Sequence, residues 1–251
     1  MLDRSKMTDS GPIRMRPSFQ GDTTCVVRDK LIQGLVDKKG VFITCTHEIP
    51  GNKYESYSSV VIQNVDVGHI SRSAEAGGLH LDTIFVQGVN RRKHPGTPDL
   101  IVRLTDVYCH DTGGREVAFL FKDGAIEHLT LQRVAVERHI HPLTIWTTVD
   151  NPVQEVLIDE CPGLRVVFQG NGWSTVSIRN SPDVKVEAAK DQHGVKPELE
   201  YNWLEAGPEP EPSVAEQALK ARIAALEQEQ SDLHRRFDRI RDELPERRES
   251  D

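Results

Sequence analysis

One apolar pattern recurs along the middle of the chain and restricts the folds that it can adopt. Each copy spans eight positions. Positions 1, 3, 6 and 8 are apolar, positions 4 and 5 are polar, and positions 2 and 7 accept any residue. Clear copies are VVIQNVDV (60–67), LHLDTIFV (79–86), VRLTDVYC (102–109) and LTLQRVAV (129–136), and weaker ones begin at Val156 and Val176. Successive copies start about 20 to 27 residues apart, which is the spacing of a structural repeat.

The pattern has a direct physical meaning. Alternation places the two apolar side chains of a short strand on one face. The polar interruption is what a bend between two strands requires, and the alternation then resumes with the same face inside. Only a chain that turns around a continuous interior keeps one face inside through successive bends. A third side of this coil can come from the apolar stretches between the copies, VAFLF (117–121), LTIW (143–146) and RVVF (165–168).

Over roughly residues 41–186 this pattern resembles the right-handed parallel β-helix of pectate lyases and of many bacteriophage tailspikes. The resemblance implies a mainly β fold, a short three-sided solenoid whose ends need caps or partners. The alternative is an ordinary β-sandwich, whose strands also alternate. A sandwich should show several hairpin signals, and the GNG at 170–172 is the only good one in this region.

The end of the chain carries a second pattern. Residues 214–244 lack glycine and proline, and their apolar residues recur at alternating spacings of three and four. In heptad terms the a positions are Ile223, Gln230, Phe237 and Leu244, and the d positions are Leu219, Leu226, Leu233 and Ile240. This spacing predicts a coiled coil. The alternative, a helix packed on its own body, is disfavoured by the stiff Pro/Glu segment at 205–213.

The stretch RIAALE (222–227) favours a parallel trimer. It resembles the short Arg-apolar-x-x-apolar-Glu signature of parallel trimeric coiled coils and lies in the correct heptad phase. Arg222 falls at g and Glu227 at the following e, so that the two can pair between chains. Phe237 at an a position fits a three-stranded core more easily than a two-stranded one, and Gln230 can set the register.

These patterns divide the chain into an N-terminal arm (1–24), a β-helix body (25–186), an extended Pro/Glu-rich linker (187–213), an α-helical trimeric coiled coil (214–245) and a charged tail (246–251). The net charge of −8 argues against nucleic-acid binding. No apolar run is long enough to cross a membrane, and the start of the chain does not have the form of a secretory signal. No two cysteines form a CxxC pair, so we expect buried thiols at Cys25, Cys45, Cys109 and Cys161.

No catalytic pair stands out. Carboxylates that could serve a glycan-cleaving enzyme are Asp106, Asp111, Glu116, Asp123, Glu127 and Glu137. Nothing in their spacing selects two of them, and most are typical turn residues. The sequence therefore predicts a protein that is not an enzyme, with no cofactor.

Two aromatic residues and two histidines are candidates for binding surfaces. One outward column contains Asp66, Phe85, Tyr108 and Ala135, so Phe85 and Tyr108 should stack on neighbouring turns of one outer face, as a subunit interface or as a platform for a glycan. A second outward column contains Val61, His80, Arg103, Thr130 and Leu157. His139 and His141 resemble the His-x-His iron sites at some phage fibre tips, but this pair lies in the middle of the body. We expect them to be ordinary histidines and predict no metal site.

A solenoid body with a trimeric stalk resembles bacteriophage tail fibres, tailspikes and minor tail proteins. The resemblance implies a structural virion protein of the tail tip or fibre, assembled in the host cytoplasm. Its partners would be copies of itself, other phage structural proteins and a host-surface glycan. Alternatives are a trimeric capsid decoration protein, a polysaccharide depolymerase of tailspike type, and a cellular carbohydrate-binding protein.

Overall fold

A computed structural model describes residues 2–17, 24–49, 53–71, 73, 82–88, 100–111, 119–122, 124–137, 142–191 and 193–204. All of them belong to one compact unit, Met1–Ala206. The described residues contain strands and one 3-10 helix, η1 (Arg4–Lys6), but no α-helix, so none of their helices could cross a membrane. The heptad segment and its ten predicted oligomerisation residues lie outside this part of the chain, and the coiled coil stays a prediction.

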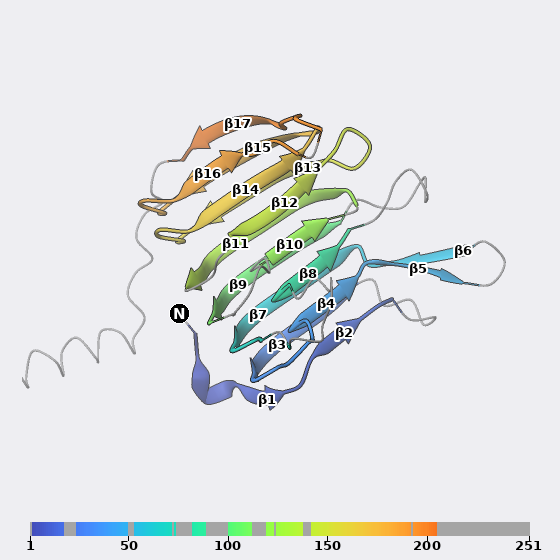
Figure 1. Cartoon of the computed structure of the whole chain (residues 1–251), viewed down its shortest axis with the longest axis vertical. Coiled ribbons are helices and arrows are strands. Elements are labelled where there is room, and N and C mark those ends of the chain that lie inside the picture. Colours follow the sequence, from blue (N-terminus) through green and yellow to red (C-terminus); the bar gives the residue numbers. More distant parts are fainter. Residues whose placement is uncertain are drawn as a thin grey trace, which may run out of the picture. The chain divides into compact units, whose positions relative to one another are not determined.

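The fold is mainly β, and its two large sheets are entirely parallel (Figure 1). The strands of the eight-stranded sheet are, in spatial order, β1 (Thr8–Ser10), β3 (Thr24–Gln33), β7 (Ser59–Gly68), β9 (Ile101–His110), β11 (Ile126–Glu137), β13 (Val153–Asp159), β15 (Trp173–Arg179) and β17 (Glu198–Trp203). Those of the seven-stranded sheet are β16 (Lys185–Ala188), β14 (Arg165–Gly170), β12 (Leu143–Thr147), β10 (Phe119–Lys122), β8 (Ile84–Gln87), β4 (Val41–Thr44) and β2 (Ile13–Met15). A separate antiparallel hairpin, β5 (Thr46–Ile49) and β6 (Lys53–Ser56), follows β4.

The chain visits the two large sheets in turn, so each circuit adds one strand to each sheet (Figure 1). This order is compatible with a β-helix-like solenoid. It rules out an ordinary β-sandwich for the described strands, because the strands of such a sandwich are antiparallel. The GNG at 170–172 joins β14 to β15, which lie in different sheets, and therefore makes no hairpin. Strand pairing also extends past residues 25 and 186, through β1, β2 and β17.

The register confirms the repeat for most of its copies. One ladder of the eight-stranded sheet joins their first residues, Val60, Val102, Leu129, Val156 and Val176. Beyond the second apolar residue the strands bend at a residue with a left-handed backbone. These residues are Asp29, Asn64, Asp106, Arg133, Glu160 and Asn180. Asn and Asp adopt this conformation more readily than most residues, which accounts for the polar interruption in the repeat.

One copy was placed in the wrong sheet by the sequence pattern. Ile84 and Val86 were expected to continue the ladder of Val60, but they belong to β8 and pair with β4 and β10. Strands of both sheets alternate around the same interior, so alternation alone cannot tell them apart. The pattern also missed β3, where Cys25 pairs with Val60, because Lys30 occupies one of its apolar positions.

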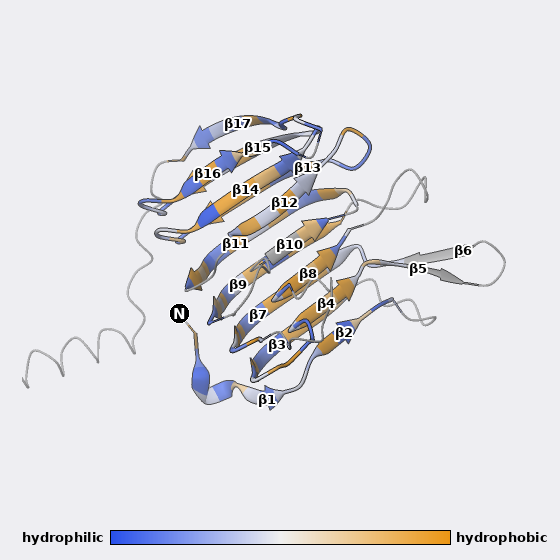
Figure 2. Ribbon diagram, viewed as in Figure 1, coloured by the Kyte–Doolittle hydropathy of each residue, from blue (hydrophilic) through white to orange (hydrophobic). Residues whose placement is uncertain are grey.

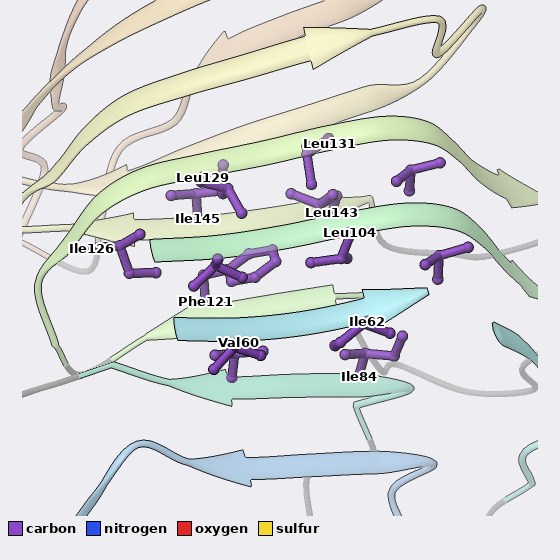
Figure 3. Close-up of a cluster of buried hydrophobic side chains, with 14 of the residues drawn as sticks. Val60, Ile62, Ile84, Leu104, Phe121, Ile126, Leu129, Leu131, Leu143 and Ile145 are labelled. Atoms are coloured by element: carbon purple, nitrogen blue, oxygen red, sulfur yellow. The ribbon is translucent and has the colours of Figure 1, made fainter. Parts of the chain in front are cut away.

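The core lies between the two sheets and receives side chains from both (Figure 3). From the eight-stranded sheet come residues such as Val60, Ile62 and Leu104, and from the seven-stranded sheet Phe121 and Ile145. Hydrophobic residues, orange in Figure 2, lie in strands of both large sheets. The prediction of buried thiols is confirmed, since all four cysteines are buried and free. Burial raises the pKa of the thiols of Cys25 and Cys161 to about 11 each.

Candidate functional site

A cluster of polar and aromatic side chains lies where β7 and β9 end. We call it the His110 cluster and define it as Asp66, His69, Tyr108, His110 and Asp111. Asp66 pairs in register with Tyr108, and Gly68 pairs with His110. Residues 66, 108 and 110 alternate with the interior residues of their strands, so the cluster stands on the outer face of the eight-stranded sheet.

Hydrogen bonds hold the His110 ring from both sides. Its Nε2 lies 2.9 Å from Asp66 Oδ1, and its Nδ1 lies 2.8 Å from Asp111 Oδ2. The side chain of Asp66 is fully buried, and its other oxygen accepts a hydrogen bond of 2.9 Å from Arg4 Nη2. The N-terminal segment that carries η1 thus reaches the cluster through Arg4, and the orientation of the imidazole is fixed by a carboxylate that is itself held.

Ring contacts complete the packing. Tyr108 stacks on His110 with ring centroids 4.7 Å apart, and His69 meets His110 edge-on at 5.3 Å. The Tyr108 hydroxyl donates to Glu137 Oε2 at 2.7 Å. Gly68 is needed here, because a Cβ atom at this position would overlap the His110 ring.

The structure brings together only some of the residues that the sequence singled out. Tyr108 and Asp111 belong to the His110 cluster, and Glu137 is bonded to it. The predicted stacking of Phe85 on Tyr108 is wrong, because Phe85 lies on β8 of the other sheet. There Phe85 is 8% exposed, packs on Phe42 at 5.1 Å between centroids and is covered by Lys39. Outside the described residues lie His80, Glu116, Asp123, His139 and His141.

Two members of the cluster, His69 and His110, were missed, and Asp66 was placed in the same outward column as Tyr108 but was not recognised as a binding residue. The repeat itself contained the signal: Gly68 and His69 follow one copy directly, and His110 and Asp111 follow another. Aligning the copies places Gly68 beside His110 and His69 beside Asp111. Among the residues just beyond the copies, the pattern of carboxylates selected only Asp111 and Glu137.

Asp106 is an ion-pair partner and not a proton donor. Arg133 Nε lies 2.7 Å from Asp106 Oδ1, and its Nη2 lies 2.9 Å from Oδ2. Partial burial is the largest single effect and raises the pKa of Asp106, but the hydrogen bonds and the charge of Arg133, together with further positive charge nearby, leave the pKa below its ordinary value. A carboxyl that acts as general acid needs a raised pKa. Arg133 also pairs with Glu160 at 2.9 Å, so this group ties three neighbouring strands together at their bends.

Asp159 makes the fold sensitive to acid. Its buried carboxylate accepts two hydrogen bonds from Arg179, at 3.0 and 2.6 Å, and these hold its pKa below the ordinary 3.8. A lowered pKa stabilises the fold above pH 3.8, and that stabilisation is lost as the pH falls through the lower folded-state pKa. We therefore expect the difference in unfolding free energy between wild type and Asp159→Asn to shrink below pH 4 or so.

Urea unfolding followed by circular dichroism between about pH 2.5 and 7 measures this difference. The matched control is Asp183→Asn, because Asp183 is exposed and has no hydrogen bond among the described residues. Its replacement should cost little at any pH. A cost for Asp159→Asn that is the same at low and neutral pH would contradict the role of the Arg179 pair.

A shallow surface hollow of about 460 Å³ runs along the other half of the same outer face. In-register outward residues line it, one from each of five strands: Arg103, Thr130, Leu157, Ser177 and Asn202. The predicted column is confirmed for its described members, since Val61 pairs with Arg103. Within the hollow His128 Nδ1 lies 2.8 Å from Glu155 Oε2. Four of these five outward residues are polar, and Leu157 interrupts their row.

The fold and the site define a mainly β protein with two parallel sheets and a cluster of polar and aromatic side chains on the outer face of one of them. Comparisons of the chain with protein-family models, with curated proteins and with solved structures found no match.

Proposed function

We propose that this chain is a structural protein of a bacteriophage particle, a tail-tip or fibre component in which a β-helix body is joined to a trimeric coiled coil. The observation that carries the proposal is the stack of in-register parallel strands around one interior, followed in sequence by a heptad repeat. A short stack of strands leaves its ends open and therefore needs partners. A coiled coil supplies such partners, because it brings copies of the chain together.

The last strand of the stack supports association. Tyr201 pairs with Val176 and Trp203 with Ile178, so both aromatic residues continue interior columns. They are nevertheless 43% and 71% exposed, because β17 is the edge strand of the described sheet. An exposed edge with apolar side chains favours pairing with another chain. We infer that assembly covers this end.

The hollow on the outer face is the contact surface of the proposal. A row of in-register side chains along the hollow, which includes Arg103, Thr130 and Ser177, suits an extended partner, such as a host-surface glycan or a neighbouring virion protein. Three copies around one axis would present three such surfaces at fixed spacing, which raises the overall affinity without tight individual contacts.

Light scattering tests the trimer. We expect the full chain to have three times the molar mass of one chain, and the chain truncated after Glu205 to be monomeric. Leu226→Asp, at a d position, should likewise dissociate the trimer, whereas Ala225→Asp, at an outward c position, should not. A monomeric full-length chain would overturn the proposal.

Mass spectrometry of purified phage particles tests the virion assignment separately. We expect the chain to be present in the particles at a copy number that is a multiple of three. A trimer that is found in the lysate but not in the particles would refute the assignment to the virion and leave the assembly intact.

A further inference from the structure

We propose that His69, His110 and Asp111 form a binding site for a divalent transition-metal ion, with Asp66 as the carboxylate that orients His110. The inference goes beyond the proposed function and does not depend on it, since all four residues come from one chain.

The three proposed ligand residues already lie close enough to one another to share one metal ion. One nitrogen or oxygen atom from each lies within 4.8 Å of the others, and His110 Nδ1 and Asp111 Oδ2 are 2.8 Å apart. Two ligands of a tetrahedral zinc ion are separated by roughly 3.3 Å, given metal–ligand distances of about 2.0 to 2.1 Å. An ion between Nδ1 and Oδ2 therefore requires only a small separation of these two atoms and a modest approach of His69.

Asp66 prepares His110 for this role. With Nε2 directed to the Asp66 carboxylate at 2.9 Å, Nδ1 is the nitrogen left to face Asp111 and His69. Histidine ligands of metals usually donate their second ring N–H to a carboxylate or carbonyl in this way, which fixes the ring and raises its basicity. Arg4 holds the far oxygen of Asp66, so the orienting carboxylate has one position.

His69 supplies the movable ligand. Its side chain is exposed, and in the described part of the chain its ring forms no hydrogen bond. It can therefore turn towards the ion without breaking a hydrogen bond. His69 and Asp111 both have a left-handed backbone, with φ of 53° and 50°, directly after the ends of β7 and β9.

The chemistry of the ligands selects the ion. Two imidazoles and one carboxylate suit Zn²⁺, Co²⁺, Ni²⁺ or Fe²⁺, whereas Ca²⁺ and Mg²⁺ prefer oxygen ligands throughout. The negative charges of Asp66 and Asp111 face the site, and Arg4 offsets one of them. With three protein ligands, at least one coordination position remains for water or for a group of a partner.

The experiment uses the untagged full chain after treatment with a chelator. Calorimetric titration with Zn²⁺ should give one tight site per chain, and Co²⁺ should give visible absorption bands of a site with nitrogen and oxygen ligands. We expect His69→Ala and Asp111→Asn each to weaken the binding of Zn²⁺ at least 10-fold, and Asp66→Asn to weaken it about 10- to 100-fold. His128→Ala is the matched control, because His128 is a partly exposed histidine of the same sheet and should leave the affinity unchanged.

Circular dichroism establishes that each variant is folded, and the exposed position of His69 makes His69→Ala the decisive one. The proposal is overturned if the wild-type chain binds no Zn²⁺, or if His69→Ala and Asp111→Asn bind it as tightly as the control does. An unchanged affinity in Asp66→Asn alone would refute the orienting role of Asp66.

Discussion

Replacing Phe121 with alanine is expected to lower the free energy of unfolding by about 3 to 5 kcal/mol. Phe121 is 1% exposed and lies on β10, where it pairs with Val86 on one side and with Ile145 on the other. It is among the largest fully buried side chains and fills the space between the two sheets (Figure 3). Its removal loses the transfer free energy of the ring and leaves a cavity that parallel sheets on both sides cannot close.

Urea unfolding of the wild type and the variant measures this cost. Phe42→Ala is the matched control, since Phe42 lies on β4 of the same sheet but on its outer side, where it is only partly buried. We expect the control to cost less than half as much. Equal costs for the two variants would contradict a core shared between the sheets.

Gly68→Ala is expected to lower the free energy of unfolding by about 2 to 4 kcal/mol, although it adds only a single methyl group at the end of β7. The new Cβ atom would overlap the His110 ring, which Asp66 and Asp111 hold from both sides and Tyr108 covers. The ring must move away, and the buried carboxylate of Asp66 then loses one of its hydrogen bonds.

Thermal and urea unfolding check this cost, with Gly11→Ala as the control, because a Cβ atom at Gly11 would meet nothing within 4 Å. The control should change stability by less than about 1 kcal/mol. If Gly68→Ala is as mild as Gly11→Ala, the His110 ring is not held as tightly as its contacts indicate.

The apolar repeat predicted much of the strand arrangement. The alternation at Val60, Val102 and Leu129 predicted a chain that circles a continuous interior, and these residues share one ladder in the structure. Hydrophobic periodicity is a local property that is visible within each single copy of the repeat. It could therefore be recognised from the sequence. The assignment of Ile84 to the same ladder failed because periodicity reports which side chains point inward, not which sheet a strand joins.

The candidate site was only partly predictable. Tyr108, Asp111 and the outward position of Asp66 were predicted individually, whereas His69 and His110 were not, because a single copy of the repeat does not show which residues beyond its end meet those of the next copy. Phe85 was grouped with Tyr108 because one copy of the repeat was assigned to the wrong sheet. A shift of one strand between sheets is enough to separate two side chains that a linear alignment places together.

By itself the sequence determined that the chain is mainly β and repetitive, because each copy of the repeat contains the apolar alternation and the polar residues of the bend. It also predicts the coiled coil, since heptads need no knowledge of the rest of the chain. The tertiary structure alone decided that His110 meets Asp66, 44 residues away in the sequence, with Arg4 behind it. That contact depends on the register between two parallel strands, which the intervening loops allow to vary and only the packing of the whole stack fixes.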